Sequence, residues 1–105
     1  MNEPYVFFED LKKTGEAPEN GILSRTLQND EKSKTVVFGF APGQELSAHT
    51  APYPATLYFV EGEADITLGS DSKTAGPGTF VYMTARLEHG IRARTNVVML
   101  LTMIK

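Results

Sequence analysis

Short β-prone runs separated by turn-forming residues recur along this chain at intervals of about 8–12 residues. Glycine, proline and asparagine mark the turns, and no stretch has the periodicity of an amphipathic helix longer than about two turns. Together these runs predict roughly eight to ten strands in an all-β sandwich or barrel. The clearest strand candidates are residues 21–28, 35–40, 56–60, 64–68, 79–83, 88–94 and 97–104.

Three of these runs indicate how their side chains are buried. Residues 64–68 alternate apolar and polar side chains with the period of two expected of a half-buried strand. Residues 88–94 alternate in the same way, and His89 belongs to the apolar face. Residues 97–104 are nearly all apolar, which predicts a closing strand buried on both faces. We interpret residues 69–72 as a turn.

The length of 105 residues fits one domain, because domains cluster near ~100–150 residues. We therefore expect a single domain over residues 1–105, with an N-terminal arm and loop at 1–20 and the barrel core at 36–104. Within the arm, residues 5–8 (YVFF) are a short apolar strand candidate, and residues 9–13 are compatible with one helical turn.

An apolar strand left unpaired favours association with another chain. We therefore predict a homodimer that uses the N-terminal arm. Sedimentation that finds a monomer at micromolar concentration, unchanged by deleting residues 1–12, would contradict this prediction.

Composition excludes several classes of function. Ten Lys and Arg against thirteen Asp and Glu give a net charge of −3, which disfavours nucleic acid as a partner. Cysteine is absent, so disulfides, thiolate metal sites and cysteine nucleophiles are excluded. The first residues do not resemble a secretory signal, and the longest apolar run, residues 97–101, is far short of the ~20 needed to span a bilayer. We expect a soluble cytoplasmic protein with no membrane partner.

His49 and His89 are the only two histidines. Each lies at the edge of a strand-like run bounded by glycine. Isolated histidines are most often packed or surface groups, so this reading stands beside a functional one. If one barrel closes over both imidazoles, they form a pair of titratable groups in a cleft, which is typical of a functional site.

Glycine and histidine recur at two fixed spacings. The first block consists of Gly43, five further residues, His49 and the closing Gly62. The second block consists of Gly78, five further residues, Thr84, Ala85, Arg86, two residues and His89. This frame resembles the two motifs of the cupin family. The resemblance implies a single-domain jelly-roll barrel, the double-stranded β-helix, with a pocket around the two histidines.

The chain departs from the family's metal-binding pattern. Cupins that hold a metal typically use three histidines and a glutamate, but the second histidine position here is Ala51 and the glutamate position is Ala55. Thr84 and Arg86 replace the proline and second glycine of the second motif. A divalent metal ion of unknown identity, held weakly by His49 and His89, is what the resemblance still implies, and Glu45 is the nearest further ligand candidate.

Three functions remain open for this small-molecule pocket. The first is a metal-dependent oxygenase or isomerase with His49 and His89 as metal ligands and catalytic residues. The alternative is a metal-free module that binds or senses a small ligand, with the two imidazoles as hydrogen-bonding groups. Metal-free acid–base catalysis by one imidazole is a third reading. The walls predicted from strand parity and from the motif positions are Ala51, Ala55, Leu57, Phe59 and Ile91.

Overall fold

The computed structural model describes residues 4–105, which form nine strands and one short helix. The number of strands agrees with the sequence prediction. The elements are α1 (Leu11–Thr14), β1 (Ile22–Asn29), β2 (Ser33–Phe40), β3 (Glu45–His49), β4 (Ala55–Glu61), β5 (Ala64–Leu68), β6 (Asp71–Ala75), β7 (Phe80–Met83), β8 (His89–Ala93) and β9 (Val97–Ile104).

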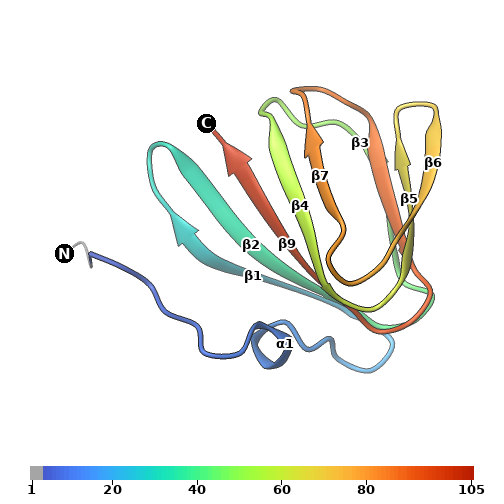
Figure 1. The fold of residues 1–105 in the computed structure, drawn as a ribbon, viewed down its shortest axis with the longest axis horizontal. Coiled ribbons are helices and arrows are strands. Elements are labelled where there is room, and N and C mark those ends of the chain that lie inside the picture. Colours follow the sequence, from blue (N-terminus) through green and yellow to red (C-terminus); the bar gives the residue numbers. More distant parts are fainter. Residues whose placement is uncertain (1–3) are drawn as a thin grey trace.

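The strands form two antiparallel sheets that face each other (Figure 1). The larger sheet has the order β1-β2-β9-β4-β7, and the smaller sheet has the order β3-β8-β5-β6. Apart from the hairpins β1–β2 and β5–β6, neighbouring strands in each sheet are distant in sequence, which is the pattern of a jelly-roll barrel. The all-β, double-stranded β-helix prediction is confirmed. The larger sheet begins with β1, N-terminal to the range 36–104 expected for the barrel core.

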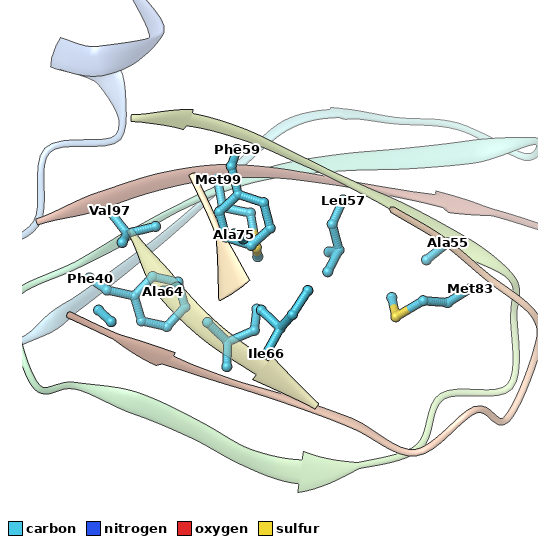
Figure 2. Packing of buried hydrophobic residues seen from close by; sticks show 12 residues of the cluster. Phe40, Ala55, Leu57, Phe59, Ala64, Ile66, Ala75, Met83, Val97 and Met99 are labelled. Atoms are coloured by element: carbon cyan, nitrogen blue, oxygen red, sulfur yellow. The ribbon is translucent and has the colours of Figure 1, made fainter. Parts of the chain in front are cut away.

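Alternate side chains of β4 and β9 build the core between the sheets. Leu57 lies opposite Leu101, and Phe59 lies opposite Met99. Leu57, Phe59 and Met99 are almost completely buried. Figure 2 shows Phe59 and Met99 packed toward one end of the barrel and Ala55 toward the other. The fully buried Phe40, Phe59, Val97 and Met99 therefore fill the end of the barrel away from Ala55 and Met83.

The alternation predicted for β5 and β8 is present. Ala64 and Ile66 are buried on one face of β5, and His89, Ile91 and Ala93 are buried on β8. Strand β9 differs from its prediction, because only its first three residues, 97–99, are buried on both faces. Gly15 packs against Val98 on the outer face of the sheet, and the following residues of β9 lose this cover.

Strand β6 (Asp71–Ala75) was not predicted, because residues 69–72 were interpreted as a turn. The turn ends earlier, and Asp71 already pairs with Leu68. Four of the five residues of β6 are exposed and polar, so the strand carries no apolar alternation. It is the edge of the smaller sheet, and polar and charged residues on an edge strand oppose pairing with other chains.

The N-terminal arm forms one helical turn and no strand. Asp10 caps α1 by accepting hydrogen bonds from the backbone N–H groups of Lys12 and Lys13. The predicted strand at residues 5–8 is wrong within the chain, because this segment has no regular structure and most of it is exposed. The homodimer stays a prediction. Among residues 4–105, no helix has the length and hydropathy that crossing a bilayer requires.

Two glycines of the first motif offer a matched test of backbone strain. Gly43 and Gly62 have φ angles of 84° and 86°, which favour glycine. A Cβ at Gly43 would meet nothing within 4 Å, whereas one at Gly62 would overlap the carbonyl oxygen of Asn96. We expect Gly43→Ala to cost about 1–2 kcal/mol from backbone strain. Gly62→Ala should cost a further ~1–3 kcal/mol from overpacking.

Urea unfolding of the two variants measures this difference, and equal losses of stability would contradict the close approach of Asn96. The m-value should stay unchanged in both, since the folded state keeps its compactness.

Candidate functional site

The pairing of β3 with β8 brings the two histidines together. His49 and His89 are direct partners in this antiparallel ladder, so their side chains project side by side. Their ring centroids are 4.4 Å apart, with an angle of 55° between the rings. The convergence of two residues forty positions apart in sequence therefore follows from strand register.

A bulge in β3 puts His49 on the inner face. Leu46 pairs with Ile91, and the next pair is His49 with His89, so three steps along β3 match two steps along β8. Strict alternation would place Leu46 and His49 on opposite faces. The extra residue corrects the parity, and both side chains then border the same small cavity.

Each imidazole is oriented by the backbone carbonyl of the residue two positions earlier in the chain. The Nδ1–H of His49 donates to the Ser47 oxygen at 2.9 Å, and that of His89 donates to the Leu87 oxygen at 2.8 Å. A carbonyl oxygen only accepts, so Nδ1 carries the proton in both rings. In the neutral ring the Nε2 atom then keeps its lone pair. With both rings neutral, the site presents two Nε2 acceptors, and the Nδ1 hydrogen bonds fix the orientation of each ring.

The two rings differ in burial. His89 is 7% exposed and is the one buried polar or charged residue of the described chain. His49 is exposed to solvent, because β3 lies at the edge of the smaller sheet. His49 is therefore the outer member of the pair and His89 the inner member.

Two pockets include both histidines, and the larger of them, the main pocket, has a volume of about 240 Å³. It lies at the end of the barrel that carries the β3–β4 and β7–β8 connections, away from α1 (Figure 1). This volume is about that of eight water molecules, so the pocket suits a compound smaller than a drug-sized ligand. Its walls are Ser24, Thr26, Lys34, Val36, Phe38, His49, Ala51, Tyr53, Ala55, Met83, Thr84, Leu87, His89, Leu101 and Met103.

The structure distributes the predicted wall residues over three places. Ala51 and Ala55 border the main pocket. Leu57 and Ile91 border a smaller cavity of about 50 Å³, which also includes both histidines. Phe59 borders neither cavity and is fully buried in the core. Its inward direction was predicted correctly, but it lies two side-chain repeats beyond Ala55 on β4, toward the packed end of the barrel (Figure 2).

Sequence reasoning missed the contribution of the larger sheet to the pocket. Ser24 and Thr26 on β1 and Lys34 on β2 border the cavity opposite the histidine strands. One signal could have found Lys34. It shares the parity of Val36 and Phe38, so it is a charged residue in an otherwise apolar inward series.

Arg86 has the backbone conformation expected of the glycine that it replaces in the second motif. Arg86 has a φ angle of 67°, in the left-handed region where glycine is favoured, and glycine is the family's residue at that position. The Arg86 N–H donates to the Ala51 oxygen, which joins the β7–β8 and β3–β4 connections at the pocket. Glu45, the further ligand candidate, pairs with Arg92 and does not border the main pocket.

The side chains present do not fit a tightly held metal ion. Protein sites for such ions usually supply three or four ligands. His49 and His89 supply two, and alanine methyl groups occupy the positions where the resemblance puts the second histidine and the glutamate. Within residues 4–105, no group of three or more His, Asp or Glu side chains could hold an ion.

The fold and the site define a small double-stranded β-helix protein with a histidine-bordered pocket open at one end of the barrel. Residues 36–105 match the family model described as Cupin domain, which is more than half of the chain. The chain belongs to the cupin family. No curated protein matches it.

Solved structures agree with this family. A conserved protein of unknown function from Streptococcus pyogenes is 28% identical, with a TM-score of 0.85, and the match covers 100% of this chain and 90% of that chain. A cupin superfamily protein from Desulfitobacterium hafniense is 24% identical, with a TM-score of 0.86 and 94% of each chain covered. A likeness to an RmlC-like cupin from Shewanella frigidimarina has 21% identity, a TM-score of 0.82, and coverage of 98% and 91%. The latter two show the fold alone.

Proposed function

We propose that this cupin binds a small molecule in the pocket around His49 and His89. The observation that carries the proposal is the fixed orientation of both imidazoles, whose Nδ1–H groups are occupied by backbone carbonyls. Both Nε2 atoms are thereby left to accept hydrogen bonds from a ligand. The apolar walls supply burial, so affinity and orientation come from different parts of the pocket.

The metal-free form of this function is better supported than the metal-dependent one. Two imidazoles orient a ligand by hydrogen bonding without any further group. A divalent ion on His49 and His89, used by an oxygenase or isomerase, would need the bound compound to complete its ligand set. The metal-dependent function remains the alternative, and it is supported by the same two Nε2 lone pairs, which could also bind an ion.

Thermal unfolding with a library of small compounds tests the proposal. A ligand present at 100 times its Kd adds about 2.7 kcal/mol to the stability of the folded protein. For a domain of this size, that raises Tm by about 10 °C or more. We expect such a compound to lose its effect in His49→Ala and to keep it in Tyr58→Phe, whose side chain lies outside the pocket.

His49→Ala is the preferred variant because His49 is exposed, and its loss should leave the fold intact. A library that shifts Tm equally in the wild type and in His49→Ala would overturn the proposal. So would a library that produces no shift at millimolar concentration.

A further inference from the structure

One cationic side chain lies among the walls of the main pocket. Lys34 is on β2, where it pairs with Met103 of β9 and shares the inward face of Val36. It is partly buried and borders the cavity. A lysine at an inward position is costly unless its ammonium group finds a partner. Its place in the fold therefore needs an explanation.

The described residues provide no anionic partner for Lys34. Within residues 4–105, the only salt bridge joins Arg94 to Asp65, and the Lys34 ammonium group makes no hydrogen bond to another described residue. None of the pocket walls is acidic. The cavity therefore presents a positive charge without a counter-ion, and a bound anion would supply one.

Two hydroxyl groups lie on the same side of the pocket as Lys34. Ser24 and Thr26 face inward on β1, next to β2 in the larger sheet. Their side chains make no hydrogen bond within the described chain, so both are available as donors. Thr26 lies opposite Val36 and Ser24 opposite Phe38, so the two hydroxyl groups and Lys34 are spread along one wall of the pocket. A wall with an ammonium group and hydroxyl donors suits a carboxylate, whose two oxygens accept several hydrogen bonds.

The opposite side of the pocket presents hydrogen-bond acceptors, whereas the Lys34 side presents donors. The histidine pair belongs to β3 and β8 of the smaller sheet and presents Nε2 acceptors. A ligand must bring a donor to this side, and a hydroxyl group is the simplest neutral one. Because the two sides belong to facing sheets, the ligand's carboxylate and its hydroxyl must lie at opposite ends of an apolar body.

We propose that the pocket selects small apolar hydroxycarboxylates, with the carboxylate at Lys34 and the hydroxyl at the His49–His89 pair. This inference rests on the proposed function and names its ligand class. The cavity volume of about 240 Å³ limits the ligand to a compact body such as one aromatic ring or a short aliphatic chain. The sides formed by Val36 and Leu101 bury that body.

Calorimetric titration of matched acids and amides tests the inference. The probes are 4-hydroxyphenylacetate and 6-hydroxyhexanoate, which differ in rigidity and length, together with their primary amides. We expect the wild type to bind at least one acid about tenfold more tightly than its amide, because a charge-assisted hydrogen bond is stronger than a neutral one. The ratio of the acid's affinity to the amide's affinity should fall to near one in Lys34→Gln. It should rise again in part in Lys34→Arg, which keeps the charge.

Lys73→Gln is the matched control. Lys73 is exposed on β6 and does not border the pocket, so this variant makes the same change of net charge at a remote position. It should keep the wild-type preference. Phenylacetate tests the other end of the ligand, because it lacks the hydroxyl group. The wild type should bind phenylacetate more weakly than 4-hydroxyphenylacetate, whereas His49→Ala should bind the two compounds with equal affinity.

The outcomes separate this inference from the proposed function. Equal binding of acids and amides by the wild type, or an acid preference that survives in Lys34→Gln, overturns the anionic ligand class. The same holds if no acid binds although other compounds bind in a His49-dependent way. In these cases the small-molecule pocket stands. Failure of every compound to bind in a His49-dependent way overturns both.

Discussion

Replacing Phe59 by alanine is expected to lower the free energy of unfolding by about 3–5 kcal/mol. Phe59 is 0% exposed and packs at the filled end of the barrel with Met99 (Figure 2). Removing the ring loses its burial and leaves a cavity that the surrounding strands can close only in part. Domains of this size are stable by only about 5–15 kcal/mol, so the loss is a large share of the total. Tm should fall by at least about 12 °C.

Phe80→Ala is the matched control for this experiment. Phe80 lies on the edge strand β7 and is 64% exposed, so the same substitution should change stability by no more than about 0.5 kcal/mol. Chemical denaturation of both variants gives the comparison. Similar stabilities would mean that Phe59 is not a core residue, and the placement of the pocket at the other end of β4 would then have to be revised.

Introducing the two ligands that the family's metal-binding members have should create a metal site. Ala51 and Ala55 border the same pocket as His49 and His89. The double substitution Ala51→His with Ala55→Glu would complete a set of three histidines and a glutamate. We expect the variant to bind Zn²⁺ or Co²⁺ at least about 100-fold more tightly than the wild type, since loss of even an outer partner of a metal ligand costs about 10–100-fold.

Calorimetry with each ion on the metal-stripped proteins measures this gain. The double variant Ala51→Asn with Ala55→Gln has side chains of similar size but weaker donors, and it should behave like the wild type. Adding His49→Ala to the histidine–glutamate variant should abolish most of the gain. If the wild type already binds one ion as tightly as the designed variant, the metal-free reading is wrong and the metal-dependent alternative replaces it.

The fold could be predicted where alternation follows burial. In residues 64–68 and 88–94, one face of the strand meets the core and the other meets solvent, so the period of two is visible in the letters. Strand β6 has no such face, because its position at the sheet edge leaves four of its five residues exposed. A polar edge strand and a long polar turn look alike in a single sequence.

The site was predictable only in part, because its geometry depends on register. The alternation of β3 alone would turn His49 away from the face of Leu46, and the bulge that corrects this leaves no mark in the sequence. The histidine pair was inferred from the spacing of the motifs instead. The depth of the pocket could not be predicted from the sequence either. Alternation along β4 predicts that the Phe59 side chain points inward, but it does not predict how far Phe59 lies from the open end of the barrel.

The fully buried core and the pocket lie at different ends of the barrel. Stability and the proposed ligand binding therefore depend on different residues, whereas in many small proteins they depend on the same ones. The filled end holds the fully buried core residues, while the end around the histidines holds the pocket that we propose binds a ligand. Substitutions at the mouth can therefore accumulate without unfolding the chain, because most neutral changes are those that leave stability above its threshold. A chain built in this way is free to acquire new specificities by changing a few mouth residues while its scaffold stays the same.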